Sequence, residues 1–433
     1  MFQPALRTLA ILGLLAYTSF AHRDEEVITR DIAIIGGGAS GTFSAVRLRD
    51  QGKSVILIEK ESILGGHTNT YQDPVTKVPV DYGVEVFHAQ QIVKDYLDRL
   101  NVSWVVAPNF GVGSIYLDGQ TAQPINYTSP DLPVARWQEL LQPFGDFLAK
   151  HPDINNASLT IFRFGQGLGD FLVQPTLYVF KNFGLEIVQA LSTGFLAVTS
   201  QNNYEIYDHA TKLLGSDVLL SSTVISTLHR EDNGVTLVVQ TPSGRRIVKA
   251  KKLLIAIPQK LENLRAFDLD HHEAGLFGQF KNTGYWTSLV TNTGLPAGFN
   301  TISVGADTPY NLPNVPLVYA VVPTAIDGIF DIKYGSQSSL PDDHVRREIL
   351  SYVKKLQDNG FAEKVEPEFV RFNSHTPFEL TVSPEKIRGG FYKQLYGLQG
   401  YRGTWYTGAA FHTQDSSLLW NFTESHVLPG LLK

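Results

Sequence analysis

A glycine-rich segment near the start of the chain has the residue types and the spacing needed to hold a phosphate. Gly36, Gly38 and Gly41 follow a G-x-G-x-x-G pattern, and Ala39 and Ser40 separate the last two glycines. Glycine at these points permits a tight turn, lets a pyrophosphate approach the backbone, and lets a helix lie close to a strand. The N–H groups at the start of that helix would face the phosphates. The spacing therefore predicts a dinucleotide-binding turn.

An acidic residue stands where such a turn needs one. Glu59 lies 18 residues beyond Gly41. A carboxylate there can bond both hydroxyls of an adenosine ribose, and it disfavours a 2′-phosphate. A G-x-G-x-x-G pattern alone is weak evidence, because glycines in a loop are more often only a turn. The acid strengthens the dinucleotide interpretation.

The elements around these residues follow the order that the motif requires. Residues 31–35 and 54–58 are short runs rich in β-branched and other apolar residues, typical of buried parallel strands. Between them, residues 42–50 have the apolar spacing of a helix. Strand, glycine turn, helix and a second strand that ends at the acid together predict a Rossmann-like unit.

Three segments resemble those of the flavin-containing amine oxidoreductase superfamily, which includes monoamine oxidases and phytoene desaturases. Residues 59–66 repeat its E-x5-G-G arrangement, residues 81–83 its D-x-G segment, and residues 400–408 the strand and glycine that close its flavin site. The resemblance implies FAD as the cofactor, since plain NAD dehydrogenases lack the second glycine pair. It carries cofactor contacts over to the following residues: Gly36, Gly38, Ala39, Ser40, Gly41, Glu59, Lys60, Gly65, Gly66, His67, Val224, Gly408, Ser417 and Leu418.

Two places depart from the superfamily pattern. The residue after the glycine pair is usually Arg and is His67 here, which can hydrogen-bond but lacks a fixed charge. A surface-loop histidine without a ligand is the alternative. The acid that usually follows the last glycine and binds the ribityl chain is replaced by Ala409 and Ala410. His412, Gln414 and Asp415 could contact the ribityl chain or the flavin ring. Phe411, Trp405 and Trp420 could line the flavin face, but these aromatic residues would suit a hydrophobic core equally well.

One lysine is the candidate catalytic residue. In amine oxidases a lysine holds a water at flavin N5 and helps oxygen to react with reduced flavin, and the resemblance implies this role for Lys281. The alternative is a solvated lysine at the start of a strand. The sequence has no paired carboxylates and no Ser/His/Asp arrangement that would indicate hydrolysis.

The order of segments predicts an α/β protein whose Rossmann-like FAD-binding domain is of the glutathione reductase and amine oxidase type. Residues 106–205 include helix-like stretches at 134–150 and 168–199, which suit a helical cap, although ordinary packing helices would look the same. Short β runs over 217–258 and 285–333 predict two sheets, the second of them mixed. The expected parts are a signal peptide (1–21), three FAD-binding segments (28–105, 206–265 and 386–433), the cap (106–205) and the sheet of an inserted substrate domain (266–385).

The N-terminal residues predict entry into the secretory pathway. Residues 9–17 form an apolar run, preceded by Arg7 and followed by Ser19 and Ala21 at the −3 and −1 positions of a cleavage site. The run is far shorter than the roughly 20 residues that span a bilayer. We therefore expect cleavage after Ala21 and a soluble mature protein in the lumen or outside the cell, with an uncleaved anchor as the alternative. Four sequons predict glycosylation at Asn101, Asn126, Asn156 and Asn421.

The amino-acid composition excludes cysteine-based chemistry and argues against a nucleic-acid or membrane partner. The 433 residues include no cysteine, which excludes disulfides, thiol catalysis, Cys-based zinc sites and a flavin linked through cysteine. The formal charge of −6 indicates no polybasic surface for nucleic acid or anionic lipid. We therefore expect a small molecule as the partner, and no metal.

Within the superfamily, residues 65–71, 292–296 and 404–412 are most similar to the fungal β-cyclopiazonate dehydrogenase group, which closes a ring oxidatively on an indole alkaloid precursor. The resemblance implies hydride removal from an activated C–H, next to nitrogen in an amine or alkaloid. Oxygen would reoxidise the flavin, and secondary metabolism would be the setting. Two alternatives stay open: a flavin desaturase or isomerase acting on lipids or terpenoids, and a non-catalytic FAD-binding protein.

Overall fold

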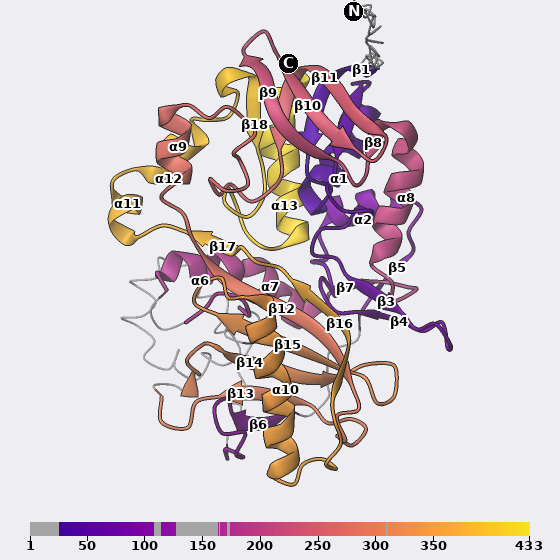
Figure 1. The fold of residues 1–433 in the computed structure, drawn as a ribbon, viewed down its shortest axis with the longest axis vertical. Helices are drawn as coiled ribbons and strands as arrows, with labels where there is room; N and C mark the ends of the chain where they lie inside the picture. The colour runs from indigo at the N-terminus through magenta and orange to yellow at the C-terminus, as the bar shows by residue number, and fades with distance from the viewer. Residues whose placement is uncertain (1–25, 108–113, 127–162, 164, 171–173, 309–310) are drawn as a thin grey trace, which may run out of the picture.

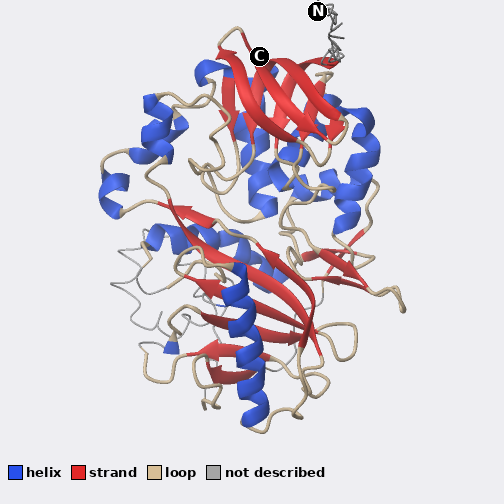
Figure 2. Cartoon of the chain, in the orientation of Figure 1, coloured by secondary structure: helices blue, strands red, loops and turns tan. Residues whose placement is uncertain are grey.

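The computed structural model describes residues 26–107, 114–126, 163, 165–170, 174–308 and 311–433. One lobe lies above the other in Figure 1, and Figure 2 shows that each contains a large sheet with helices against it. The signal peptide and its expected cleavage site after Ala21 lie outside the described residues, as does the helix-like stretch at 134–150. No helix of the described part of the chain is long and apolar enough to cross a bilayer.

The first sheet has the strand order β8-β2-β1-β11-β10-β9, and β18 pairs with the end of β11. The pairs among β8, β2, β1, β11 and β18 are parallel, whereas β10 pairs antiparallel with both β11 and β9. Its strands are β1 (Glu26–Ile35), β2 (Val55–Ile58), β8 (Val218–Leu219), β9 (Thr223–Glu231), β10 (Gly234–Thr241), β11 (Gly244–Ile255) and β18 (Thr404–Tyr406).

The register of this sheet gathers the ends of its parallel strands. Ile35 of β1 lies beside Ile58 of β2 and Ile255 of β11, and Ile255 lies beside Tyr406 of β18. Because parallel strands end at the same edge of a sheet, the residues that follow these four strands meet there. The glycine turn, Glu59 and Gly408 are therefore neighbours in space despite their distance in the chain.

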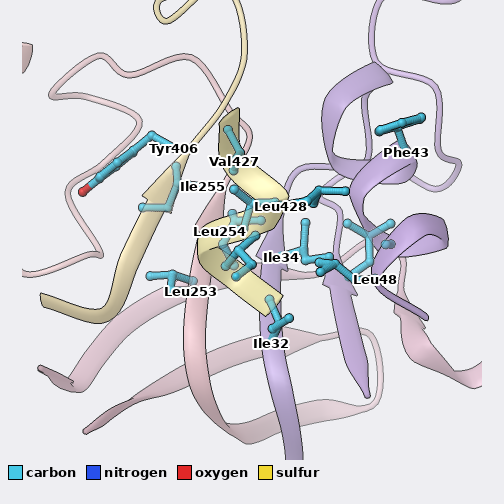
Figure 3. Close-up of a cluster of buried hydrophobic side chains, with 14 of the residues drawn as sticks. Ile32, Ile34, Phe43, Leu48, Leu253, Leu254, Ile255, Tyr406, Val427 and Leu428 are labelled. Atoms are coloured by element: carbon cyan, nitrogen blue, oxygen red, sulfur yellow. The ribbon is translucent and has the colours of Figure 1, made fainter. Parts of the chain in front are cut away.

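Helix α1 (Ala39–Asp50) begins directly after the glycine turn and packs against the C-terminal helices α13 (Ser416–Phe422) and α14 (Leu428–Leu432), which a π-helical turn at Thr423–Val427 connects. The buried half of β1, residues 32–35, is apolar throughout because the sheet is covered on both faces. Figure 3 shows side chains of β1, α1, β11, β18 and the C-terminal segment in one cluster. Because both the first strand and the C-terminal segment contribute side chains to this cluster, its burial holds the two ends of the described chain together.

The second sheet has the order β16-β12-β15-β14-β13-β6, with β17 paired to β12, and only the β13–β6 pair is parallel. The mixed sheet expected from the sequence is thus present. Helix α10 (Asp342–Asp358) covers one of its faces (Figure 1). Its strands are β6 (Ile115–Asp118), β12 (Lys281–Thr291), β13 (Thr301–Val304), β14 (Leu317–Pro323), β15 (Phe330–Ser336), β16 (Glu368–Ser374) and β17 (Phe378–Thr381).

The segment expected to be a helical cap differs from that expectation. It supplies β6 to the second sheet, and β7 (Leu196–Val198) pairs with β5 (Trp104–Val106). The helix-like stretch at 168–199 contains two short helices, α6 (Thr176–Asn182) and α7 (Leu185–Thr193). Pro175, Gly184 and Gly194 flank them, and these residue types interrupt helices, which explains why apolar spacing alone overestimated their length.

The remaining elements lie at the periphery of the two sheets or connect them. Strands β3 and β4 form a two-stranded antiparallel sheet. Helix α8 packs on α1. These peripheral and connecting elements are β3 (Thr70–Gln72), β4 (Pro79–Asp81), α2 (Gln91–Arg99), α8 (Tyr204–Leu214), α9 (His271–Phe277), α11 (Pro384–Arg388) and α12 (Phe391–Tyr396).

Candidate active site

The glycine turn has the shape that its sequence predicts. Gly36 has φ +99°, and a Cβ there would lie 2.7 Å from Ile257. A Cβ on Gly41 would overlap the carbonyl oxygen of Gly36, so only glycine lets α1 pack on the turn. Gly38 is the N-cap of α1, without a side-chain cap or an acidic residue in the first turn. The backbone N–H groups at this helix start are therefore oriented toward whatever lies in front of it.

The second glycine pair packs directly on the first. Gly65 donates its N–H to the carbonyl of Gly37 at 2.8 Å, and both Gly65 and Gly66 have positive φ, +135° and +56°. A Cβ on Gly66 would lie 2.8 Å from Cα of Gly38, closer than side chains tolerate. The two glycine segments of the sequence thus form one backbone surface, which brings Gly38, Gly65 and Gly66 together as predicted.

Glu59 lies beneath this surface. Its carboxylate accepts the Gly37 N–H at 2.6 Å and the Glu61 N–H at 2.8 Å, and its carbonyl accepts the Ser222 N–H at 2.8 Å. Val224, another predicted residue, lies two positions after Ser222 at the start of β9, where it pairs with Val239 of β10. Lys60, in contrast, has a side chain that is 76% exposed and lies 3.6 Å from Glu61.

The C-terminal segment reaches the same edge of the sheet. Gly408 has φ +112°, and no atom lies within 4 Å of the place where its Cβ would be. Ser417 is buried, and its hydroxyl accepts the backbone N–H of His88 at 3.0 Å. The Leu418 N–H donates to the carboxylate of Asp415 at 2.8 Å. The predicted contact between the Leu418 amide and a cofactor would therefore require this cap to open.

A charged pair joins the first and last thirds of the chain beside this cap. His88 Nε2 lies 3.2 Å from Asp415 Oδ2. Burial works to lower the pKa of His88, but the Asp415 carboxylate outweighs it, so the pKa is raised overall. The pair therefore favours the protonated form of His88 beside Asp415 at the start of α13.

A cluster of rings connects His67, the residue after the glycine pair, with the second sheet. His67 stacks on His375, which follows β16, with ring centroids 4.3 Å apart and planes 11° apart. Phe378 lies 5.9 Å from His67 and 5.0 Å from Tyr285 of β12 between ring centroids. His375 Nε2 lies 2.8 Å from Asn69 Oδ1. We call His67, His375, Tyr285 and Phe378 the aromatic wall.

Both histidines of the wall are held neutral. Burial, with a smaller effect of Lys60, lowers the pKa of His67 to about 4. Burial, His67 and Lys333 together hold the pKa of His375 well below its ordinary value. Two stacked imidazoles cannot easily hold two protons, and a nearby ammonium adds to the same effect. The wall is therefore uncharged at neutral pH.

A buried charge cluster lies on the same face of the second sheet. Lys333 of β15 pairs with Glu85, and its ammonium lies 3.5 Å from Asp331 Oδ2. Burial alone would lower the pKa of Lys333, but the two carboxylates raise it well above its ordinary value. Burial raises the pKa of Asp331. Lys333 is therefore a fixed cation beside the aromatic wall.

The predicted catalytic lysine, Lys281, lies away from this cluster in an exposed position. Lys281 is the exposed first residue of β12 and pairs with Thr381 of β17, so its side chain faces solvent. Among the described residues, two largely buried lysines, Lys181 and Lys333, were not singled out from the sequence. The signal for Lys333 was present: residues 329–334 place Asp331 and Lys333 at alternate positions of an otherwise apolar strand, which directs both to one face.

Comparison with known proteins identifies the class. Residues 34–100 match the family model described as an NAD(P)-binding Rossmann-like domain. FAD-dependent oxidoreductase oblC of Cochliobolus heterostrophus is 39% identical, with 94% of this chain and 92% of that protein covered. Beta-cyclopiazonate dehydrogenase of Aspergillus oryzae is 34% identical, with 97% and 98% covered.

The chain belongs to the fungal FAD-dependent oxidoreductases.

Solved structures agree on the fold of this oxidoreductase. A fatty acid isomerase from P. acnes has a TM-score of 0.73 at 18% identity, covering 92% of this chain and 98% of its own. Putrescine oxidase bound to putrescine has a TM-score of 0.57 at 16% identity, covering 93% and 100%. At such identities the likeness concerns the fold alone. The predicted similarity to the β-cyclopiazonate dehydrogenase group of FAD-dependent oxidoreductases, the α/β fold class and the FAD cofactor are confirmed.

The cradle of the oxidoreductase fits FAD on features of its own. Gly38 and Gly66 expose their backbone without side chains, the start of α1 presents uncapped N–H groups, and the Glu59 carboxylate lies beneath them. Open space lies next to Gly408 at the same sheet edge. A dinucleotide needs a close backbone approach for its pyrophosphate and an acid for its ribose. These residues supply both.

Several other predicted contacts of the oxidoreductase lie in its core instead. Trp420 is fully buried, stacks between Phe43 and Phe87, and donates to the carbonyl of Ala39 at 3.1 Å. Phe411 is buried and stacks on Tyr406. The predicted flavin-face role of these two rings is therefore replaced by packing between the helices and the first sheet.

The remaining aromatic and polar candidates have partners near the C-terminal helices. Trp405 lies under the Lys252 ammonium, 5.0 Å from ring centroid to nitrogen. The ring of His412 stacks on Phe422. Gln414 is partly buried in the loop before α13. These positions leave a cofactor contact of His412 or Gln414 as a prediction.

A second lysine that the sequence did not reveal lies at the departure after Gly408. Lys181 of α6 donates to the Ala409 carbonyl at 3.1 Å and pairs with the fully buried Glu379 at 2.9 Å. Lys181 thus links Glu379 of β17 to the backbone of Ala409, where the superfamily usually has an acid and this chain has alanine. One carboxylate oxygen of Glu379 accepts a hydrogen bond from Lys181 and the other accepts one from Asn182.

The sequon residues of the oxidoreductase lie on its surface where they are described. Asn101, Asn126 and Asn421 are exposed, while Asn156 lies outside the described residues.

A cavity of about 480 Å³ opens at the end of β9, lined by Glu231, Asp268, Asp270 and Arg402 among others. None of the cradle or wall residues lines it, so it is separate from the site.

Proposed function

We propose that this oxidoreductase removes a hydride from a C–H bond next to nitrogen in a small molecule such as an amine or alkaloid, with molecular oxygen as the final electron acceptor. The observation that carries the proposal is the aromatic wall, in which His67 stacks on His375 directly beyond the Gly38–Gly66 surface. A wall of rings from both lobes suits a flat substrate held against a cofactor. The name of the Aspergillus relative, a dehydrogenase, supports the reaction class.

The cofactor would be held by the residues of the cradle. Gly36, Gly38 and Gly41 would meet its pyrophosphate with backbone groups, and Glu59 its ribose. When bound, FAD supplies the acceptor for the hydride, which is the difficult part of the chemistry. The contacts proposed for Gly65, Gly66 and His67 follow from their position in front of the turn.

The protein itself would orient the substrate and exclude water. Tyr285 and Phe378 would contact its flat face, and His375, fixed by Asn69, would hold the position of His67. Burial raises the pKa of Tyr285, so its hydroxyl stays protonated and can donate a hydrogen bond. No separate base is required if the substrate nitrogen arrives uncharged.

The setting we propose is secondary metabolism in the secretory pathway. The apolar run at residues 9–17 and the exposed Asn101, Asn126 and Asn421 support passage through a lumen. Digestion with an endoglycosidase should increase the electrophoretic mobility of the protein purified from a fungal host. A protein that carries no glycan and keeps residues 1–21 would contradict this part.

Anaerobic photometry tests the reaction. The purified protein should be yellow, should bleach when an amine substrate is added under nitrogen, and should recover its colour with release of hydrogen peroxide when air enters. His375→Gln should slow the bleaching, whereas His271→Gln, at an exposed position of α9, should not. Bleaching by apolar lipids alone, or a flavin that no substrate reduces, would contradict the proposal.

A further inference from the structure

The segment that follows Gly408 is held at both of its ends by side chains of α6. Lys181 donates to the Ala409 carbonyl at 3.1 Å. The hydroxyl of Thr413, a fully buried residue, donates to Asn182 Oδ1 at 2.9 Å. Lys181 and Asn182 are the last two residues of α6. The end of one short helix therefore fixes the beginning and the end of a segment that lies more than 220 positions later in the chain.

The same two residues bind a buried carboxylate of β17. One oxygen of Glu379 accepts from the Lys181 ammonium at 2.9 Å and the other accepts from the Asn182 amide at 3.3 Å, and α6 lies beside β17 in Figure 1. Glu379 is fully buried, and the Lys181 side chain is 13% exposed. Separating two charges that lie so far from water is costly. Glu379 therefore fixes the two side chains that reach the segment.

The backbone at Glu379 is shaped to direct its carboxylate toward α6. Asn282 of β12 lies opposite Leu380 of β17, and the next residue, Thr283, lies opposite Phe378. Glu379 is thus the extra residue of a β-bulge, and its φ of +26° is uncommon for any residue except glycine. Bulges redirect side chains, and a strained conformation persists only where its surroundings impose it. Here the bulge places Phe378 in the aromatic wall and the next side chain against Lys181 and Asn182.

Residues 409 and 410 cannot bind the cofactor through polar side chains. Both are alanine, whose methyl group neither donates nor accepts a hydrogen bond. Gly408 has φ +112° and open space where its Cβ would be, at the sheet edge that carries the glycine cradle. The chain therefore offers backbone groups to the cofactor at this place. The position of that backbone depends on the side chains that hold it, which are those of α6 and Tyr396, a donor to the Phe411 carbonyl at 2.5 Å.

We propose that Lys181, Asn182 and Glu379 act together as positioning residues for FAD. They fix the backbone of residues 409–413 against the cofactor, at the place where the superfamily usually has an acid. None of the three needs to touch FAD, because they act through Ala409 and Thr413. The inference concerns the cofactor and not the substrate, so it is independent of the proposed function.

A matched pair of variants at Thr413 tests the inference. Thr413→Val keeps the shape of the side chain but removes the hydroxyl that bonds Asn182, whereas Thr413→Ser keeps the hydroxyl. The dissociation constant of FAD is measured by quenching of flavin fluorescence on titration into apo-protein. The visible circular dichroism of the FAD-saturated protein reports the surroundings of the flavin. Thr413→Val should bind FAD about threefold to tenfold more weakly, with a changed dichroism band, and Thr413→Ser should resemble the wild type.

A second set of variants removes the hydrogen bond to Ala409. Lys181→Met alone leaves Glu379 without its counter-charge, so it is compared with the double variant Lys181→Met with Glu379→Gln, in which neither charge remains. The double variant should regain part of the apo-protein melting temperature that the single one loses. It should still bind FAD at least about threefold more weakly than the wild type, because the Ala409 carbonyl has lost its donor. Lys354→Met, at an exposed lysine of α10, should change neither readout. If Lys181→Met does not fold, the double variant and the Thr413 pair decide.

A merely structural role gives a different pattern of results. The apo-protein would melt at a lower temperature, but the folded protein would keep the FAD affinity and the visible dichroism of the wild type. That pattern in Thr413→Val or in the double variant would overturn the inference, and so would an equal loss of affinity in Thr413→Ser. Failure of every nitrogen compound to reduce the flavin would instead overturn the proposed function, and the cofactor-binding data would stand.

Discussion

Gly38 and Gly66 approach each other so closely that a Cβ on Gly66 would lie 2.8 Å from Cα of Gly38, while a Cβ on Gly38 would lie 3.7 Å from Cα of Gly66. The two glycines therefore serve different purposes. A side chain at position 66 collides with the protein itself. A side chain at position 38 has room against the protein and would instead occupy the space in front of the turn.

The difference gives a paired prediction. Gly38→Ala should fold with an apo-protein melting temperature close to that of the wild type and yet lose its flavin. Gly66→Ala should also lose stability without flavin, by about 1–3 kcal/mol, because of the collision and its φ of +56°. Flavin absorbance after gel filtration and thermal melts of the apo-proteins measure both effects. Gly275→Ala, with open space around it in α9, is the control. A Gly38→Ala protein that stays fully yellow would contradict the assignment of the cradle.

Glu59→Gln should weaken FAD binding while the fold persists. The Gly37 and Glu61 N–H groups orient the carboxylate, which as a charged acceptor would bond the ribose hydroxyls, and hydrogen bonds to a charged group contribute about 1.5–3 kcal/mol. We expect the dissociation constant of FAD to rise about tenfold to a hundredfold, as measured by quenching of flavin fluorescence on titration into apo-protein. Glu61→Gln, whose side chain is 66% exposed, should leave the constant unchanged. Equal constants for wild type and Glu59→Gln would remove Glu59 from the site.

The histidine pair predicts a loss of stability in mild acid. The pKa of His67 is lowered from 6.5 to about 4 in the folded protein, so between these values the unfolded chain binds more protons. The free energy of unfolding should therefore fall as the pH falls from 6.5 toward 4, with a contribution from His67 of at most about 2 kcal/mol at pH 5. Urea unfolding of apo-protein at pH 7.5 and 5.0 measures it. His67→Gln should show a smaller fall, and His271→Gln the full one. An identical fall in wild type and His67→Gln would show that His67 titrates normally.

A buried ion pair in the first lobe should be necessary for stability. Arg230 and Glu273 have fully buried side chains and pair with each other, and Tyr406 donates to Glu273 at 2.6 Å. Arg230→Met should destabilise by at most about 3–5 kcal/mol, because the buried Glu273 carboxylate loses its nearest counter-charge and keeps only Arg402, 3.5 Å away. Chemical denaturation measures it. The double variant Arg230→Met with Glu273→Gln should recover part of the loss. A double variant no more stable than the single one would mean that packing, and not charge, causes the effect.

Lys281→Met should change neither reduction of the flavin by substrate nor its reoxidation by oxygen, because the side chain faces solvent at the start of β12. Stopped-flow absorbance resolves both steps. Lys333→Met should alter the substrate-dependent step. Slower reoxidation in Lys281→Met with normal reduction would restore the role that the superfamily resemblance implied.

The prediction from sequence was most accurate where function depends on short stretches of backbone. The Gly36–Gly41 turn, Glu59 and the Gly65–Gly66 pair took the geometry expected of them, because strand, turn and helix are specified within about 30 residues. It was least accurate for aromatic residues near the C-terminus. Trp420 and Phe411 are apolar and would fit either a flavin face or a core, and their sequence contains nothing that separates the two.

The sequence by itself determined the dinucleotide turn, its acid and the FAD family, since glycine spacing and local periodicity act through neighbouring residues. Only the tertiary structure decided which side chains form the wall and its charges. Asn69 contacts His375, which is 306 positions later in the chain, and Glu85 contacts Lys333, which is 248 positions later. Such pairs arise when the second sheet docks on the first lobe, and local residue preferences carry no record of that contact. Alternation placed Lys333 on one face of its strand, but only packing determined that this face is the one turned toward His67.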